Sequence, residues 1–197
     1  MILPYNLNYA SQFANYKRGN TSDATVPELA EGGVSEVGGN HKSNADKFYY
    51  DRLEWLDSRN DKLWNSDSES SPVKTESDPC PEGWRVPTDA ELNELRKNRS
   101  SWTTNTAEQP GYWFSGTSSY TEDVPQVFFP AAGNRDGYDA SLRGLCGCYW
   151  SSLPNDYSVY YDDKSCYPAY YLFFSSDSAS RSRSPRAYGY SVRCVQE

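Results

Sequence analysis

The side chains that could carry chemistry are few, and their spacing does not suit catalysis. The chain has one histidine, His41, in a glycine-flanked stretch far from any other candidate for a nucleophilic mechanism. Cys146 and Cys148, with Cys166 downstream, could offer three thiolates to a metal, but no second paired motif completes the usual zinc set. The pattern leaves open a disulfide within this trio or three free thiols. We therefore expect no catalytic residue, no metal site and no cofactor.

The five cysteines are an odd number, so they cannot all be paired within the chain. Cys80 begins a Cys-Pro-Glu-Gly-Trp run, and Cys194 lies in the last segment with strand character. A bridge between them would close a long loop and contribute about 4–5 kcal/mol in the chain-entropy account. The alternative is two buried free thiols. We favour the bridge because disulfides persist in exported proteins, and the chain is polar and acidic.

The composition excludes several classes of partner. The 197-residue chain has a net charge of −8, whereas nucleic-acid and anionic-membrane binders present basic surfaces. No segment approaches the roughly 18 apolar residues of a membrane-spanning helix. The first residues lack the basic start and apolar run of a signal peptide, so we expect that a leader was removed or that export follows another route. Tyr and Trp are abundant, at 17 and 6 residues, and suit partly exposed surfaces.

The elements that must position these residues are read from periodicity and capping signals. Residues 1–45 form an extended or looped N-terminal extension with an early strand near 2–7, and a domain follows over 46–197. A broad apolar stripe predicts a helix over 44–56. Thr88 and Glu91 form a capping box, which predicts a helix that ends near 97–98.

The second half of the chain reads as short strands separated by turns. One or two helices followed by such strands indicate an α+β fold rather than alternating βαβ units. The strands are expected over 112–116, 126–130, 149–152, 169–175 and 190–195.

The strand expected over 169–175 has two different faces. Tyr171, Phe173 and Ser175 share one face, while Leu172 and Phe174 share the other and suit a core. The first set would then point outward as large aromatics on a wet surface. The alternative is that these aromatics pack beneath a loop.

The stretch 175–188 has almost no apolar residue and predicts a surface loop. Arg181, Arg183 and Arg186 concentrate positive charge there, and the Tyr- and Ser-rich composition is typical of binding loops. Residues 165–195 also contain no Lys, Glu, Gln, Met or Trp, although the first hundred residues use Lys and Glu freely. Such a restricted set of amino acids indicates a restricted set of codons.

Four sequence blocks in order carry a family resemblance: DPCPEGWRVPT at 78–88, VFFPAAG at 127–133, YWSS at 149–152 and RAYGYSVRCV at 186–195. Their order resembles the C-type-lectin-like variable proteins of diversity-generating retroelements, which occur in gut bacteria of the Bacteroides type and their phages. These proteins are related in fold to formylglycine-generating enzymes. The resemblance covers residues 50–197 and implies a C-type lectin-like fold of short twisted antiparallel strands with one or two helices.

In that family a reverse transcriptase mutates adenines while it copies a template. Certain Asn codons can therefore change into codons for Tyr, Ser, Asp, Arg, Pro, Phe or Cys. The resemblance implies a variable region over 146–188 and a Cys80–Cys194 disulfide, with the other cysteines as products of variation. It implies a fixed framework of Tyr149, Trp150, Leu172, Phe174, Gly189, Val192 and Cys194. The implied variable, ligand-binding positions are Cys146, Cys148, Tyr171, Phe173, Ser175, Ser178, Ser180, Ser182, Arg183, Ser184, Pro185 and Tyr188.

The expected function is therefore binding of a protein or cell-surface ligand outside the cell, on a bacterial surface or a phage particle. Calcium-dependent lectins have characteristic residue triplets, and this chain has only a partial match to them in Leu153-Pro154-Asn155-Asp156. Neither calcium nor sugar is therefore expected as a ligand. Two alternatives remain. One is an enzyme of the formylglycine-generating type that uses Cys146 or Cys148, and the other is an invariant lectin-like domain of an adhesin or pilus tip.

Overall fold

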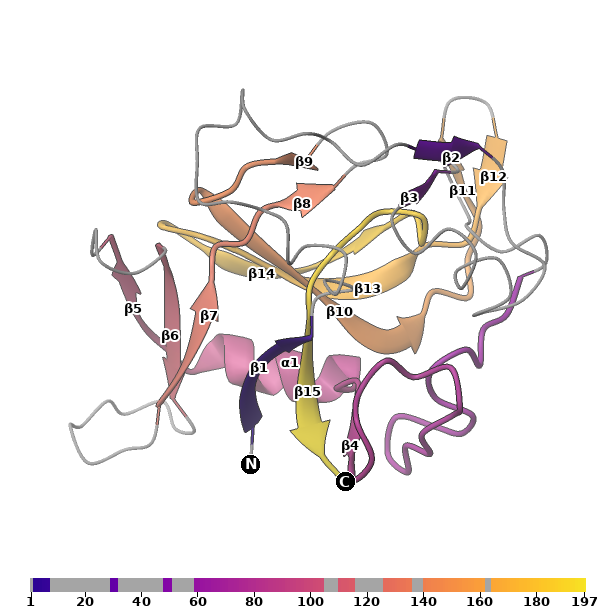
Figure 1. Ribbon diagram of the computed structural model, residues 1–197, viewed down its shortest axis with the longest axis horizontal. Coiled ribbons are helices and arrows are strands. Elements are labelled where there is room, and N and C mark those ends of the chain that lie inside the picture. Colours follow the sequence, from indigo (N-terminus) through magenta and orange to yellow (C-terminus); the bar gives the residue numbers. More distant parts are fainter. Residues whose placement is uncertain are drawn as a thin grey trace.

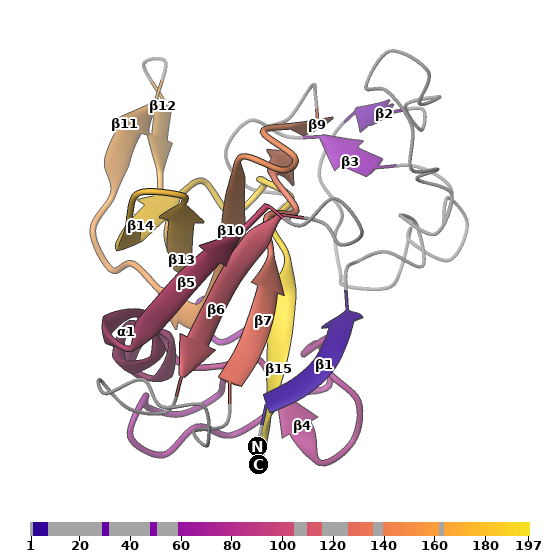
Figure 2. The ribbon, with the colours of Figure 1, turned by 90° about the vertical axis from the view of Figure 1, so that its left-hand side faces the viewer.

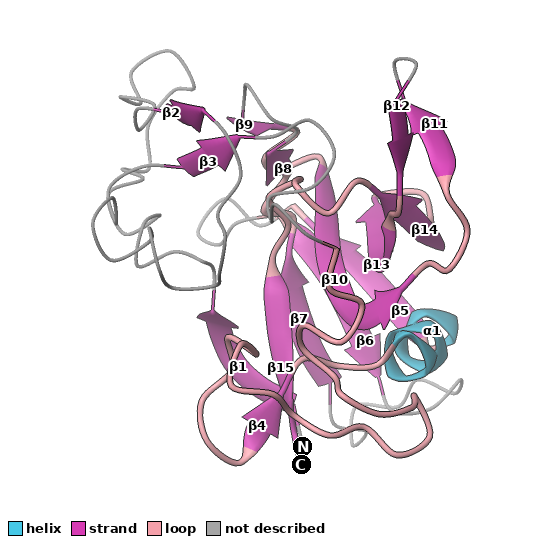
Figure 3. Ribbon diagram, turned by 90° about the vertical axis from the view of Figure 1, so that its right-hand side faces the viewer, coloured by secondary structure: helices cyan, strands magenta, loops and turns pink. Residues whose placement is uncertain are grey.

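The computed structural model describes residues 2–7, 29–31, 48–50, 59–104, 110–115, 126–135, 140–161 and 164–197. These residues form a strand-dominated fold with a single helix among them, α1 (Asp89–Lys97) (Figures 1 and 3). The arrangement agrees with the α+β class. Of the two predicted helices, the capped one is the helix that the described residues contain.

Helix α1 begins at the predicted capping box. The Thr88 hydroxyl accepts a hydrogen bond from Glu91 N (3.2 Å), and Thr88 N donates to the Glu91 carboxylate (2.8 Å). Two backbone N–H groups that the first turn would leave unpaired are satisfied in this way. The helix ends at Lys97 with Asn98 as its C-cap, and Leu92 is its buried apolar contact with the core.

Three antiparallel sheets of three strands each form the frame (Figure 1). The first has the order β1-β15-β4, and its pairing of β1 with β15 joins strands from near the two ends of the chain (Figure 2). The second is β5-β6-β7 and the third is β10-β13-β14. The strand bounds are β1 (Ile2–Leu7), β15 (Val192–Gln196), β4 (Trp84–Arg85), β5 (Arg99–Thr103), β6 (Gly111–Ser115), β7 (Gln126–Pro130), β10 (Cys146–Pro154), β13 (Ala169–Ser175) and β14 (Ala179–Ser184).

Smaller two-stranded sheets complete the described structure: β2 (Leu29–Glu31) with β3 (Phe48–Tyr50), β8 (Asn134–Arg135) with β9 (Ala140–Ser141), and β11 (Val159–Tyr161) with β12 (Lys164–Cys166). Strand β3 corrects the helix expected over 44–56, because Phe48–Tyr50 pairs in parallel with β2. Three consecutive aromatic residues favour a strand once a partner is available. The rest of that predicted helix, like His41, lies outside the described residues.

An aromatic core lies between α1, the β5-β6-β7 sheet and the β10-β13-β14 sheet. We call it the inner core, and its buried members are Leu92, Tyr112, Phe114, Phe129, Ala131, Tyr149, Leu172 and Phe174. Phe174 is its central ring, stacked on Tyr149 at 5.8 Å between centroids and edge-on to Phe114 at 5.6 Å. The prediction that Leu172 and Phe174 point to the core is confirmed.

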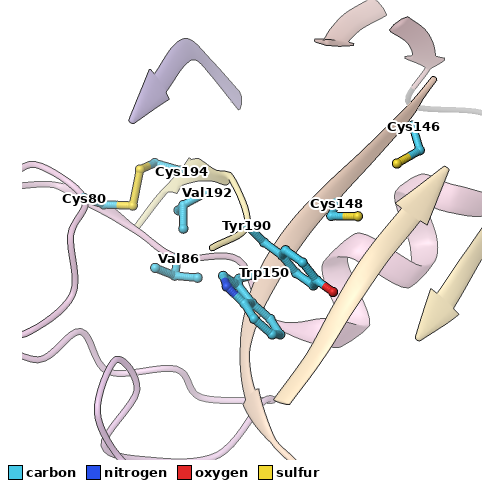
Figure 4. Packing of buried hydrophobic residues seen from close by; sticks show 8 residues of the cluster. All are labelled: Cys80, Val86, Cys146, Cys148, Trp150, Tyr190, Val192 and Cys194. Atoms are coloured by element: carbon cyan, nitrogen blue, oxygen red, sulfur yellow. A yellow bond between two sulfur atoms is a disulfide. The ribbon is translucent and has the colours of Figure 1, made fainter. Parts of the chain in front are cut away.

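A second buried group, the disulfide cluster, contains Cys80, Val86, Cys146, Cys148, Trp150, Tyr190, Val192 and Cys194 (Figure 4). The predicted Cys80–Cys194 disulfide is present and joins residues 114 apart in sequence. Asp78 holds the local chain, since its carboxylate accepts from Cys80 N (2.7 Å) and Val86 N (2.9 Å). The bridge ties the segment before α1 to the last strand.

The remaining cysteines, Cys146, Cys148 and Cys166, are buried and form no disulfide, which decides against a bridge within this trio. Among the described residues no group of three or more His, Cys, Asp or Glu side chains could hold a metal ion, so the three thiols do not form one site. None of the helical segments that the structure describes has the length and apolarity to cross a membrane.

Candidate ligand-binding face

The register of the β10-β13-β14 sheet brings most of the predicted variable positions onto one side of it. Directly paired residues of an antiparallel sheet share a face, and successive residues alternate between faces. Strands β10 and β13 pair as Cys146↔Ser175, Cys148↔Phe173 and Trp150↔Tyr171. Strands β13 and β14 pair as Phe173↔Ser180, Tyr171↔Ser182 and Ala169↔Ser184. We call the shared side the candidate face; its predicted variable members are Cys146, Cys148, Tyr171, Phe173, Ser175, Ser180, Ser182 and Ser184.

Three of the four framework residues of strands β10 and β13 lie on the opposite side. Tyr149, Leu172 and Phe174 point into the inner core with 0–2% exposure. Trp150, by contrast, lies on the candidate face and is buried in the disulfide cluster. The sheet thus separates a packed aromatic side from a side that carries hydroxyls, thiols and two partly exposed aromatic rings.

The other predicted positions flank this face. Ser178 is exposed in the turn between β13 and β14, and its carbonyl accepts from Ser175 N (2.8 Å) to close the hairpin. Pro185 is buried and Tyr188 is half-buried in the segment after β14. Arg183 pairs with Tyr170 and therefore lies on the other side of the sheet, where it is exposed.

Strand β14 corrects the prediction of a surface loop over 175–188. Only residues 176–178 turn, and Ala179–Ser184 then pairs along the length of β13. Its sequence alternates Ser and Arg with a period of two, which is the signal that could have identified a strand. The low strand propensity of such polar residues hid it, because pairing with a buried neighbour outweighs propensity.

An aromatic cluster supports the candidate face and corrects the expectation that its rings project freely into solvent. Tyr190 stacks on Trp150 at 4.4 Å between ring centroids and contacts Tyr171 at 4.6 Å, while Trp150 and Tyr171 meet edge-on at 5.7 Å. Tyr171 and Phe173 are half-buried against the disulfide cluster. They occupy the predicted face, but one side of each ring is packed.

Hydroxyl contacts connect this cluster to β14. The Tyr190 hydroxyl lies 2.8 Å from the Ser184 hydroxyl, and both side chains are buried. Burial raises the pKa of Tyr190 above its usual value, so the phenol stays neutral and able to donate. Sequence reasoning did not assign a role to Tyr190, although it lies within the last of the four sequence blocks, RAYGYSVRCV at 186–195.

The two thiols of β10 form a buried pair. Cys146 and Cys148 are each 3% exposed and point to the same side of the strand (Figure 4). Interaction with the neighbouring Cys148 thiol lowers the pKa of Cys146 against the opposing effect of burial. The same interaction, together with burial, raises the pKa of Cys148. The pair is therefore a packed element of the face rather than a solvent-exposed part of it.

Burial distinguishes two groups within the predicted variable set. Cys146, Cys148, Ser184 and Pro185 are buried, whereas a changeable surface was expected at every position. The physical reason is that the disulfide cluster and the Ser184–Tyr190 contact cover one part of the face. The accessible positions are Tyr171, Phe173, Ser175, Ser178, Ser180, Ser182, Arg183 and Tyr188.

The three arginines of this region do not form the expected cationic patch. Arg181 pairs with Asp89 at the start of α1 (2.6 Å), and its guanidinium lies over the Tyr170 ring. Arg186 pairs with Asp61 (2.6 Å), and hydrogen bonds from arginines lower the pKa of this carboxyl despite its partial burial. These contacts anchor β14 and the segment after it, and only Arg183 offers an exposed charge without an ion pair in the described part of the chain.

Comparisons of the chain with known protein families, with curated proteins and with solved structures found no match. The family resemblance and the variable positions therefore remain predictions that rest on the residues themselves.

Proposed function

We propose that this protein is a ligand-binding variable protein of the kind diversified by retroelements, with a C-type lectin-like fold. It acts outside the cell, on a bacterial surface or a phage particle, and binds a protein or cell-surface ligand through the candidate face. The observation that carries the proposal is the common placement of the predicted variable positions. Positions chosen from sequence alone, on two strands and a predicted loop, lie mostly on one side of one sheet.

Packing supports this assignment because diversity is tolerated where side chains do not determine the core. The core side of the same strands is filled by Tyr149, Leu172 and Phe174, whose side chains are buried. The candidate side carries Tyr and Ser, which give contact area at low entropic cost and adaptable hydrogen bonding. The Cys80–Cys194 disulfide stabilises such a frame in an oxidising environment.

The burial pattern sharpens the proposal. We expect wide variation at the accessible positions and narrow variation, restricted to small residues, at Cys146, Cys148, Ser184 and Pro185. Gly147 illustrates how little room the core side leaves, because an added Cβ would lie 2.1 Å from Phe174 Cζ.

Sequencing of the locus in many isolates tests the proposal. Substitutions should concentrate at adenine-rich codons within 146–188, with the codons of Leu172 and Phe174 as an internal control. A reverse-transcriptase gene and a near-copy of the 3′ end of this gene should lie nearby. Substitutions spread evenly along the chain, or equally frequent at the two control codons, would refute retroelement diversification.

A second candidate function is oxidation chemistry of the formylglycine-generating type, which the two neighbouring thiols on the same side of β10, Cys146 and Cys148, favour. The burial of both thiols argues against it, since a peptide substrate must reach the reactive sulfur. Copper-dependent turnover of a cysteine-containing peptide, lost in Cys146→Ser and in Cys148→Ser, would establish the enzyme. Turnover that persists in the double variant, or is absent in the wild type, would exclude it.

A further inference from the structure

Strand β14 forms one edge of the β10-β13-β14 sheet. Among the described residues β14 pairs with β13 alone, and it forms the outside of its sheet (Figure 2). The bond from Ser175 N to the Ser178 carbonyl makes these two residues a hydrogen-bonded pair. Hydrogen-bonded and non-hydrogen-bonded pairs alternate along an antiparallel ladder. The backbone groups of Ser180, Ser182 and Ser184 therefore face β13, and those of Ala179, Arg181 and Arg183 face outward.

The residues whose backbone groups face outward at this edge are exposed or half-buried. Arg181 and Arg183 are exposed and Ala179 is half-buried. The Arg181 side chain is drawn to the core side by Asp89 and Tyr170, so it does not cover the edge. On the candidate face β14 carries only the small side chains of Ser180, Ser182 and Ser184. An added strand can therefore approach and place its own side chains beside Tyr171 and Phe173.

The positive charge of this edge argues against a second copy of the same chain as the strand that pairs with β14. Two β14 edges paired with each other would bring Arg181 and Arg183 of both chains together, and like charges across a strand pair are destabilising. A strand with an acidic residue near Arg183 would instead be attracted to the exposed guanidinium. The candidate face is continuous with this edge, so one ligand can contact both.

We propose that β14 accepts an extended, acidic segment of the protein ligand as an added strand. The backbone of Ala179, Arg181 and Arg183 supplies affinity that does not depend on side chains, and the candidate face supplies specificity. This inference rests on the proposed function, because the ligand is taken to be a protein bound at this sheet. A fixed backbone contact of this kind lets the face vary without loss of all binding.

A library of random ten-residue peptides displayed on phage, screened against the full chain, tests the inference. Enriched peptides should contain an acidic residue at the position that lies beside Arg183. Arg183→Pro removes an outward N–H without breaking the ladder to β13 and should weaken their binding at least ~10-fold. Arg183→Thr removes the charge but keeps the N–H, and should weaken binding less. Melting temperatures of both variants check that they fold.

Amide hydrogen exchange on the wild-type chain provides a readout that needs no variant. Addition of an enriched peptide should slow exchange at Ala179, Arg181 and Arg183. The inference is overturned if no peptide is enriched, if these amides stay unprotected, or if Arg183→Pro binds as well as wild type.

The two proposals fail in different ways. Peptides that lose binding in Phe173→Ser but keep it in Arg183→Pro would overturn strand addition while leaving the candidate face as a binding surface. An even spread of substitutions at the locus would overturn retroelement diversification and leave the peptide measurements unaffected.

Discussion

Phe173 and Phe174 are neighbours of the same residue type on opposite faces of β13, so replacing each with alanine compares the two faces within one strand. Phe174 is fully buried and contacts five aromatic rings of the inner core and its margin. Phe173 is half-buried at the edge of the disulfide cluster. The proposed function requires position 173 to tolerate change and position 174 to resist it.

The expected magnitudes differ clearly. Truncation of a fully buried Phe costs about 3–5 kcal/mol, including the cavity left behind. Truncation of a half-buried Phe costs about 1–2 kcal/mol from the smaller area removed from water. Domains of this size are stable by about 5–15 kcal/mol, so Phe174→Ala removes a large share of the stability and Phe173→Ala a smaller one.

Urea denaturation with the disulfide intact measures both changes. For a slope near 2 kcal/mol per molar urea, we expect the midpoint to fall by about 2 M for Phe174→Ala and by less than about 1 M for Phe173→Ala. Equal shifts for the two variants would refute the separation of faces, and with it the argument that one side of the sheet is free to vary.

Further predictions concern the frame. Reduction of the Cys80–Cys194 bridge, or its replacement by two alanines, should cost about 4–5 kcal/mol in thermal unfolding; an unchanged melting temperature would contradict this. Glu91→Gln should destabilise the fold by about 1 kcal/mol at neutral pH, since Glu91 binds Arg85 through two hydrogen bonds. Burial opposes ionisation of Glu91, but these hydrogen bonds outweigh it and lower its pKa. Its contribution is therefore present above the unfolded value of about 4.3 and is lost as pH falls through the folded pKa, so the two unfolding curves should converge in acid. Cys146, Cys148 and Cys166 should react with a thiol reagent only after denaturation, because all three are buried; rapid labelling of the native protein would contradict this placement.

Features that depend on local interactions were predictable with their bounds. The Thr88–Glu91 capping box places the start of α1, because its hydrogen bonds join residues three apart. Strands Ile2–Leu7, Gln126–Pro130 and Ala169–Ser175 occur where predicted. Strand β10 is longer than the predicted 149–152, since Cys146–Cys148 joins the ladder through pairing with β13.

Features that depend on distant partners were not predictable. The stripe over 44–56 fits a helix by periodicity, yet Phe48–Tyr50 pairs with a strand some twenty residues earlier. The Ser- and Arg-rich segment fits a loop by composition, yet it forms β14 along β13. In both cases non-local pairing supplies hydrogen bonds that local propensity does not encode.

By itself, the sequence determined the α+β class, the capped helix and the inward side of Ala169–Ser175, and it favoured a Cys80–Cys194 bridge over two free thiols. Each follows from side-chain alternation, capping or residue type, which act over a few residues or in the whole composition. Only the tertiary structure decided that Cys146, Cys148 and Ser184 are buried and that the predicted positions meet on one face. Burial and register depend on which strands pair and what packs across them, and such contacts form only when distant segments come together.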